Sequence, residues 1–230
     1  MEQKKERLED WAANRKEHMK GMPWSQKMKW YLTYYGVQTL AVVIAVGLAA
    51  YFLWSSTIGR KETWLNCVII NADADAETLN AIGEAFSETQ ELDTKKQLIT
   101  LDSSYLLDVD SDTMTQNNAS YLTKLKTYFA AKEVDLIVAP KVTCDYLDGM
   151  EYYYQDLEKV MGSGFLDQFD ESQLRYMEDE NGETFICGVS LDGSKLLTET
   201  DMMIEDPYVM IPYTSVRADN AAAFLKYIFE

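Results

Sequence analysis

An uncharged run from Leu32 to Gly59 constrains this chain more than any other feature. Its core, residues 36–54, is long enough for one helix across a hydrocarbon layer of about 30 Å. Tyrosines stand at its start, and Tyr51 and Trp54 stand near its end, as in the aromatic belts of membrane proteins. The run therefore predicts one transmembrane helix over residues 32–58.

Two other interpretations of the run fit less well. A buried core helix of this length normally keeps a polar stripe, whereas Gln38 and Thr39 are the only polar side chains in the core of the run and both lie near its start. A cleavable signal peptide has a shorter apolar region and a small-residue cleavage pattern, which the run lacks. We therefore expect the helix to be retained as an anchor.

The charges that flank the run predict its orientation. The basic residues before it are Lys4, Lys5, Arg7, Arg15, Lys16, Lys20, Lys27 and Lys29. Only Arg60 and Lys61 follow it before the chain becomes acidic. Because the more basic flank stays inside the cell, we expect a cytoplasmic tail over residues 1–31 and an extracytoplasmic domain over residues 62–230 of a single-pass cell-membrane protein.

The outer segment is strongly acidic. Residues 1–61 carry ten basic and five acidic side chains, so residues 62–230 keep 11 basic and 33 acidic ones and a net charge of −22. Nucleic-acid binding depends on neutralising phosphates with basic side chains. The segment is therefore expected to bind no nucleic acid, and its partners are the membrane, through the helix, and a small solute or an envelope protein.

The outer segment alternates strand and helix patterns. Apolar strand-like runs cover residues 64–71, 96–102 and 134–140, and amphipathic helices, the first with Asp75 as its N-cap, cover residues 75–89 and 117–133. Strand patterns at 182–191 and 207–213 and a helix at 219–230 follow. The order predicts an α/β fold, mainly a parallel sheet with flanking helices.

Several kinds of chemistry have no residues to support them. The only histidine, His18, falls on the cytoplasmic side, so the outer domain lacks a histidine base for a Ser–His or Cys–His pair. The acidic run at Asp108, Asp110 and Asp112 lacks the glycine and closing glutamate of a calcium loop. We expect no catalysis, cofactor or metal site; a carboxylate-based glycosidase is the enzymatic alternative.

The three cysteines form no metal or redox motif. Cys67 lies in an apolar strand pattern, which indicates a buried core thiol. Cys144 and Cys187 are either free or paired as a disulfide on the oxidising side of the membrane.

Topology places a candidate ligand site. In an open parallel sheet, ligands bind beyond the carboxyl ends of the strands. The residues at those ends, with a neighbouring aromatic group from Tyr152–Tyr154, are Asn71, Asp73, Asp102, Ser103, Ser104, Lys141 and Tyr153. The alternative is that these side chains cap helices and turns, and that the tyrosines pack on the surface.

The stretch from Val134 to Met161 resembles a segment of bacterial extracellular solute-binding proteins. There, a strand ending in Ala-Pro leads into a short helix, a glycine, aromatic residues and an Asp-Leu pair. The matching residues are Asp135, Ala139, Pro140, Gly149, Tyr153, Asp156 and Leu157. The helix 118–132, the strand 182–191 and the closing segment 208–230 are also similar to that family.

The resemblance implies a periplasmic-binding-protein-like α/β lobe. The outer segment has the length of little more than one lobe, and it follows a retained helix, as in Gram-positive single-span proteins with a reduced solute-binding-like domain. The expected function is non-catalytic binding of a small solute or partner protein. The alternative is a structural or assembly component of an envelope or transporter complex, with no small-molecule ligand.

Overall fold

The computed structural model describes residues 21–57, 61–109, 116–162 and 164–230. The chain divides into two compact units, Met1–Arg60 and Lys61–Glu230. Predictions that concern His18, Asp110 and Asp112 lie outside the described residues.

Among its described residues, the first unit contains the long helix α2 (Trp24–Thr57). Within it, the 21 residues from Tyr35 to Ser55 are long and apolar enough to cross a membrane. The apolar side chains of this stretch, such as Val37 and Phe52, are exposed. The prediction of one apolar helix of membrane-spanning length near the N-terminus is confirmed.

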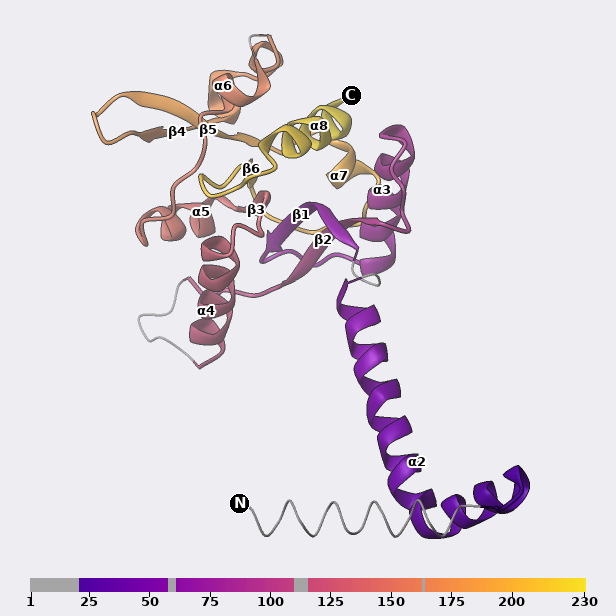
Figure 1. Ribbon diagram of the computed structural model, residues 1–230. Coiled ribbons are helices and arrows are strands. Elements are labelled where there is room, and N and C mark those ends of the chain that lie inside the picture. Colours follow the sequence, from indigo (N-terminus) through magenta and orange to yellow (C-terminus); the bar gives the residue numbers. More distant parts are fainter. Residues whose placement is uncertain (1–20, 58–60, 110–115, 163) are drawn as a thin grey trace. The chain divides into compact units, whose positions relative to one another are not determined.

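The second unit is built on one six-stranded sheet (Figure 1). Its strands are β1 (Glu62–Ile70), β2 (Gln97–Tyr105), β3 (Leu136–Pro140), β4 (Leu174–Glu178), β5 (Thr184–Ser190) and β6 (Pro207–Met210). Their order across the sheet is β2-β1-β3-β6-β5-β4. The α/β class is confirmed, and strand β4 was not predicted.

The prediction of a mainly parallel sheet is wrong. β1 runs parallel to β2 and β3, but the β3–β6, β6–β5 and β5–β4 pairs are antiparallel. A helical crossover precedes β2 and β3, which makes those strands parallel. β4 and β5 form a hairpin that turns through Gly182 at φ +80°, and a two-strand hairpin is antiparallel by construction.

Helices cover both faces of the sheet. One face carries α3 (Ala76–Thr89), α6 (Leu157–Met161), α7 (Lys195–Thr198) and α8 (Ala218–Phe229), and the other carries α4 (Gln116–Ala130) and α5 (Lys141–Asp148). Two short 3-10 turns, η1 (Leu166–Gln168) and η2 (Glu171–Gln173), precede β4. Asp75 caps α3 by accepting a hydrogen bond from Thr78 N–H, as predicted.

The alternation of strand side chains separates two apolar cores. In β3, Leu136 and Val138 join the core under α3 and α8. Ile137 and Ala139 join the core under α4 and α5. A strand that is apolar on both faces fits the interior of a sheet with helices on each side.

Asp135 anchors the amino end of β3. Its carboxylate is fully buried and accepts hydrogen bonds from Asn66 N–H (2.9 Å), Ser215 Oγ (2.8 Å) and Arg217 Nε (2.8 Å). These partners come from β1 and from the segment before α8. A residue that contributes to the solute-binding resemblance thus has a structural role here.

Candidate functional site

A hollow of about 700 Å³ lies at the carboxyl ends of β1 and β3. It is lined by Asn71, Leu107, Asp108, Val109, Pro140, Lys141, Val142, Thr143, Asp145, Met203, Ile204, Glu205 and Asp206. Asn71 follows β1, Lys141 follows β3, and residues 107–109 follow β2. The hollow therefore lies where the topological rule for open α/β sheets places a ligand.

The antiparallel strand β6 supplies the remaining wall. Pro207 at the start of β6 pairs with Pro140 at the end of β3, so the loop that precedes β6 meets the first turn of α5. Lys141 N–H donates to the carbonyl of Asp206 at 2.9 Å. Asp73 and Met203 form a two-bond backbone bridge, at 3.0 and 2.8 Å, which fixes this loop against the segment that follows β1.

Asn71 holds the wall of the hollow together. Its φ is +56°, a left-handed conformation that asparagine adopts more readily than most residues. Its Nδ2 donates to the Leu107 carbonyl (2.7 Å) and to Thr143 Oγ1 (3.0 Å), and its Oδ1 accepts from Leu107 N–H (2.7 Å). The amide is thus committed to linking three segments.

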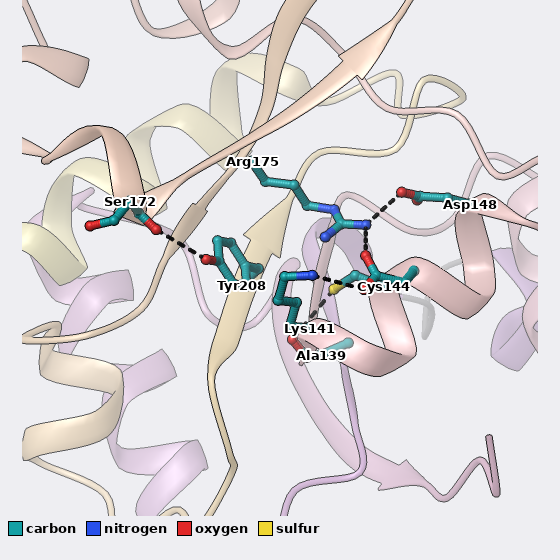
Figure 2. Close-up of polar contacts among 8 residues, drawn as sticks. Ala139, Lys141, Cys144, Asp148, Ser172, Arg175 and Tyr208 are labelled. Atoms are coloured by element: carbon teal, nitrogen blue, oxygen red, sulfur yellow. Dashed lines mark hydrogen bonds and ion pairs between the residues drawn. The ribbon is translucent and has the colours of Figure 1, made fainter. Parts of the chain in front are cut away.

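An ion-pair chain leads from the hollow to the antiparallel half of the sheet (Figure 2). Lys141 Nζ lies 2.9 Å from Asp145 Oδ2, and Arg175 Nη2 lies 2.7 Å from Asp145 Oδ1. The same Arg175 nitrogen lies 2.5 Å from Asp148 Oδ2. Arg175 is a buried residue of β4, so the chain ties that edge strand to α5.

These contacts shift the pKa values of the four groups in different directions. Burial favours a higher pKa at Asp145, but its bonds to Lys141 and Arg175 outweigh burial and lower the pKa. At Asp148 burial dominates and raises the pKa above its usual value. The bond to Asp145 raises the pKa of Lys141. Burial opposes the charge of Arg175, but its two carboxylate partners raise its pKa.

The rest of the hollow combines free carboxylates with apolar groups. Among the described residues, no ion pair involves Asp108, Glu205 or Asp206. Val142 and Met203 also line the hollow, and they are 56% and 68% exposed. The hollow therefore offers negative charge beside accessible apolar surface.

Three predicted site residues lie within β2 and outside the hollow. This strand was predicted to end at Asp102, but it continues through Ser103 and Ser104 to Tyr105, whose side chain is fully buried. Asp102 accepts from Ser104 N–H (2.9 Å) and pairs with Lys124 of α4 (3.6 Å). Because polar side chains are accommodated on this edge strand, polarity did not mark its end.

The tyrosine cluster is mostly part of the core. Tyr152 and Tyr154 are buried, and the Tyr152 ring packs edge-on against Phe129 at 4.8 Å. Tyr153 is exposed, and its carbonyl accepts from Tyr213 N–H at 2.9 Å. Tyr153 is not among the residues that line the hollow, and its role as a stacking surface stays a prediction.

The cysteines are all free and buried. Burial raises the pKa of Cys144 and of Cys187 to about 12, and it raises the pKa of Cys67 as well. The interpretation of Cys67 as a core thiol is confirmed, and Cys144 and Cys187 form no disulfide. Within the described ranges, no group of three or more histidine, cysteine, aspartate or glutamate residues could hold a metal ion.

Of the predicted site residues, Asn71 and Lys141 line the hollow, and Asp73 is adjacent to it through its bridge to Met203. The residues that give the hollow its charge and its apolar surface were not predicted. These are Asp108, Val142, Asp145, Met203, Glu205 and Asp206. The spacing of Lys141 and Asp145, four residues apart in a short helical pattern, indicates their ion pair; the loop 203–206 is found only once the direction of β6 is known.

No protein-family model, curated protein or solved structure matches the chain. Function is therefore inferred from the chemistry of the site, since a fold by itself does not imply one.

Proposed function

We propose that this chain is a membrane-tethered, non-enzymatic binding domain. It resembles a reduced solute-binding lobe of the Gram-positive type and takes a small solute or a partner protein in the hollow at its strand ends. The observation that carries the proposal is that hollow, at the carboxyl ends of β1 and β3.

The size and the lining of the hollow support ligand binding. Its volume of about 700 Å³ falls within the range of roughly 300–1,000 Å³ that is typical of ligand pockets. Such pockets combine apolar walls with a few polar groups that orient the ligand, and Val142, Met203 and Glu205 are examples of both kinds here. Backbone bonds between Lys141 and Asp206 and between Asp73 and Met203 hold the walls in place.

The ionisation of Lys141 and Asp145 supports binding without catalysis. A catalytic base or acid needs a pKa near the working pH. Asp145 lowers its pKa and Lys141 raises its pKa, so each moves away from neutrality. Their ion pair stabilises both charged forms, which favours a structural role in the wall of the hollow over a role in proton transfer.

The proposed location is the cell membrane, with one span, a cytoplasmic N-terminus and an extracytoplasmic domain. The helix of membrane-spanning length supports the single span. The eight basic residues before it against two after it support the orientation.

A thermal-shift comparison tests the proposal on the full chain in detergent. The panel contains sugars, amino acids, small peptides and basic peptides, because a ligand that binds the native state raises the melting temperature. Val142→Trp fills the mouth of the hollow, and Val216→Trp, at a residue that is 63% exposed and outside the hollow, is the matched control. We expect at least one compound to stabilise the wild type and Val216→Trp but not Val142→Trp. Equal stabilisation of all three chains would place the ligand elsewhere and refute the proposal.

A further inference from the structure

We propose that the hollow docks a basic segment of a partner protein, with a lysine or arginine side chain entering between its acidic and apolar walls. This inference rests on the proposed function and names the class of partner that the same site takes.

The charges in the hollow favour a cation. The lining has one basic side chain, Lys141, and that group is paired with Asp145. Asp108, Glu205 and Asp206 remain without an ion pair among the described residues. The N-terminus of α5 also opens here, but a helix end carries only about half a positive charge, which is less than one of these carboxylates.

The apolar part of the lining favours a long side chain over a compact cation. Val142 and Met203 present exposed carbon surface beside the carboxylates. Lysine and arginine bury an aliphatic stem against such surface while the charged head reaches a polar group. A metal ion or a small ammonium ion would leave this apolar surface in water.

The surroundings of the hollow favour a polypeptide over a free amine. Leu106, next in the chain to the lining residue Leu107, is 58% exposed, and exposed apolar side chains are frequent at protein interaction sites. The net charge of −22 on residues 62–230 attracts a segment with several basic residues at long range and speeds its association. A single amine gains little from that field.

A peptide titration on the full chain in zwitterionic nanodiscs tests the inference. The probe is a fluorescent lysine-rich peptide that includes two leucines, and the comparator carries acetyl-lysine at every lysine. We expect the probe to bind and the comparator not to bind. The test variant is Glu205→Gln/Asp206→Asn, which we expect to weaken binding at least about ten-fold, or 1.4 kcal/mol.

The matched control is Glu84→Gln/Glu88→Gln, which removes the same charge from two exposed positions of α3. We expect it to weaken binding less than about two-fold. Met203→Ser keeps the charge and removes the apolar contact, and we expect it to weaken the probe as well. If Glu205→Gln/Asp206→Asn does not fold, Asp108→Asn and Met203→Ser are compared with the α3 control in its place.

Three outcomes would overturn the inference. Equal weakening by the α3 control would show that only diffuse surface charge is involved. Competition by free lysine at the concentrations of the peptide would show a site for a small cation. Absence of wild-type binding would exclude a basic partner; if a compound in the thermal-shift panel still stabilised the wild type and not Val142→Trp, the proposed function would stand and this inference alone would fail.

Discussion

Val138→Asp places a carboxylate at the centre of the sheet. Val138 is 1% exposed and sits between Ile69 of β1 and Val209 of β6. Its side chain joins the apolar cluster under α3 and α8. The new charge would therefore be buried against apolar side chains.

The cost can be set against the stability of a domain. Burying a valine side chain contributes about 1.5–3 kcal/mol, most of which the substitution removes. Burial of an unpaired carboxylate costs several kcal/mol more. The sum is comparable with the roughly 5–15 kcal/mol that stabilises a typical domain, so we expect the Lys61–Glu230 unit to unfold.

The control is the same substitution four residues further along. Val142 is 56% exposed in the first turn of α5, where an acidic residue interacts favourably with the helix dipole. We expect Val142→Asp to change stability by less than about 0.5 kcal/mol. Limited proteolysis and near-UV circular dichroism of the detergent-solubilised full chain distinguish an unfolded Val138→Asp variant from a folded Val142→Asp variant. A melting temperature for Val138→Asp equal to that of the wild type would refute the placement of β3 in the interior of the sheet.

The parallel half of the fold was predictable because its signals are local. Continuous apolar strands and amphipathic helices alternate from β1 to β3, and Asp75 marks the start of α3. In the other half, β5, β6 and α8 were predicted as elements, but the direction of β6 was not, because β6 is buried on both faces and such a strand looks the same in either direction. Gly188 of β5 marks the close packing of β5 against β6. A Cβ at this position would lie 2.7 Å from Met210 Cγ, so glycine allows the two strands to approach this closely.

The candidate site was also predictable only where it depends on the parallel strands. Asn71 and Lys141 follow strands whose ends the sequence marks clearly, and they reach the hollow. Glu205 and Asp206 precede a strand, so they reach the same edge only because β6 is antiparallel to β3. Tyr153 follows the carboxyl end of β3 in the sequence, but the intervening helix α5 carries the chain away from the hollow.

Four further predictions concern folding, reactivity, pH and orientation. Residues 62–230 will melt cooperatively without the helix, because both apolar cores are contained in that segment; a broad transition in calorimetry would contradict this. Cys67, Cys144 and Cys187 will resist alkylation at pH 8 until denaturant is added, since burial raises the pKa of each thiol; rapid native labelling detected by mass spectrometry would be inconsistent with their burial. Asp102 and Asp145 have lowered pKa values, so they contribute stability above about pH 4 that is lost as the pH falls through their folded pKa values. Asp148 has a raised pKa, so its ionisation lowers the stability of the folded state as the pH rises. The free energy of unfolding should therefore fall less steeply with decreasing pH for Asp102→Asn than for the wild type. An equal pH dependence in the two chains would count against the Asp102–Lys124 pair. In intact cells, an impermeant thiol reagent should label Thr113→Cys and leave Ser25→Cys unlabelled; the reverse result would place the N-terminus outside.

Hydrogen exchange of the full chain tests most directly whether the hollow at the strand ends is the binding site. The exchange of backbone amides is compared with and without the compound or peptide that stabilises the chain most. We expect added protection in the first turn of α5 and in residues 203–206, where Lys141 and Asp206 are already joined by a backbone bond. Protection confined to other segments, such as the β4–β5 hairpin or α3, would contradict the assignment of the site.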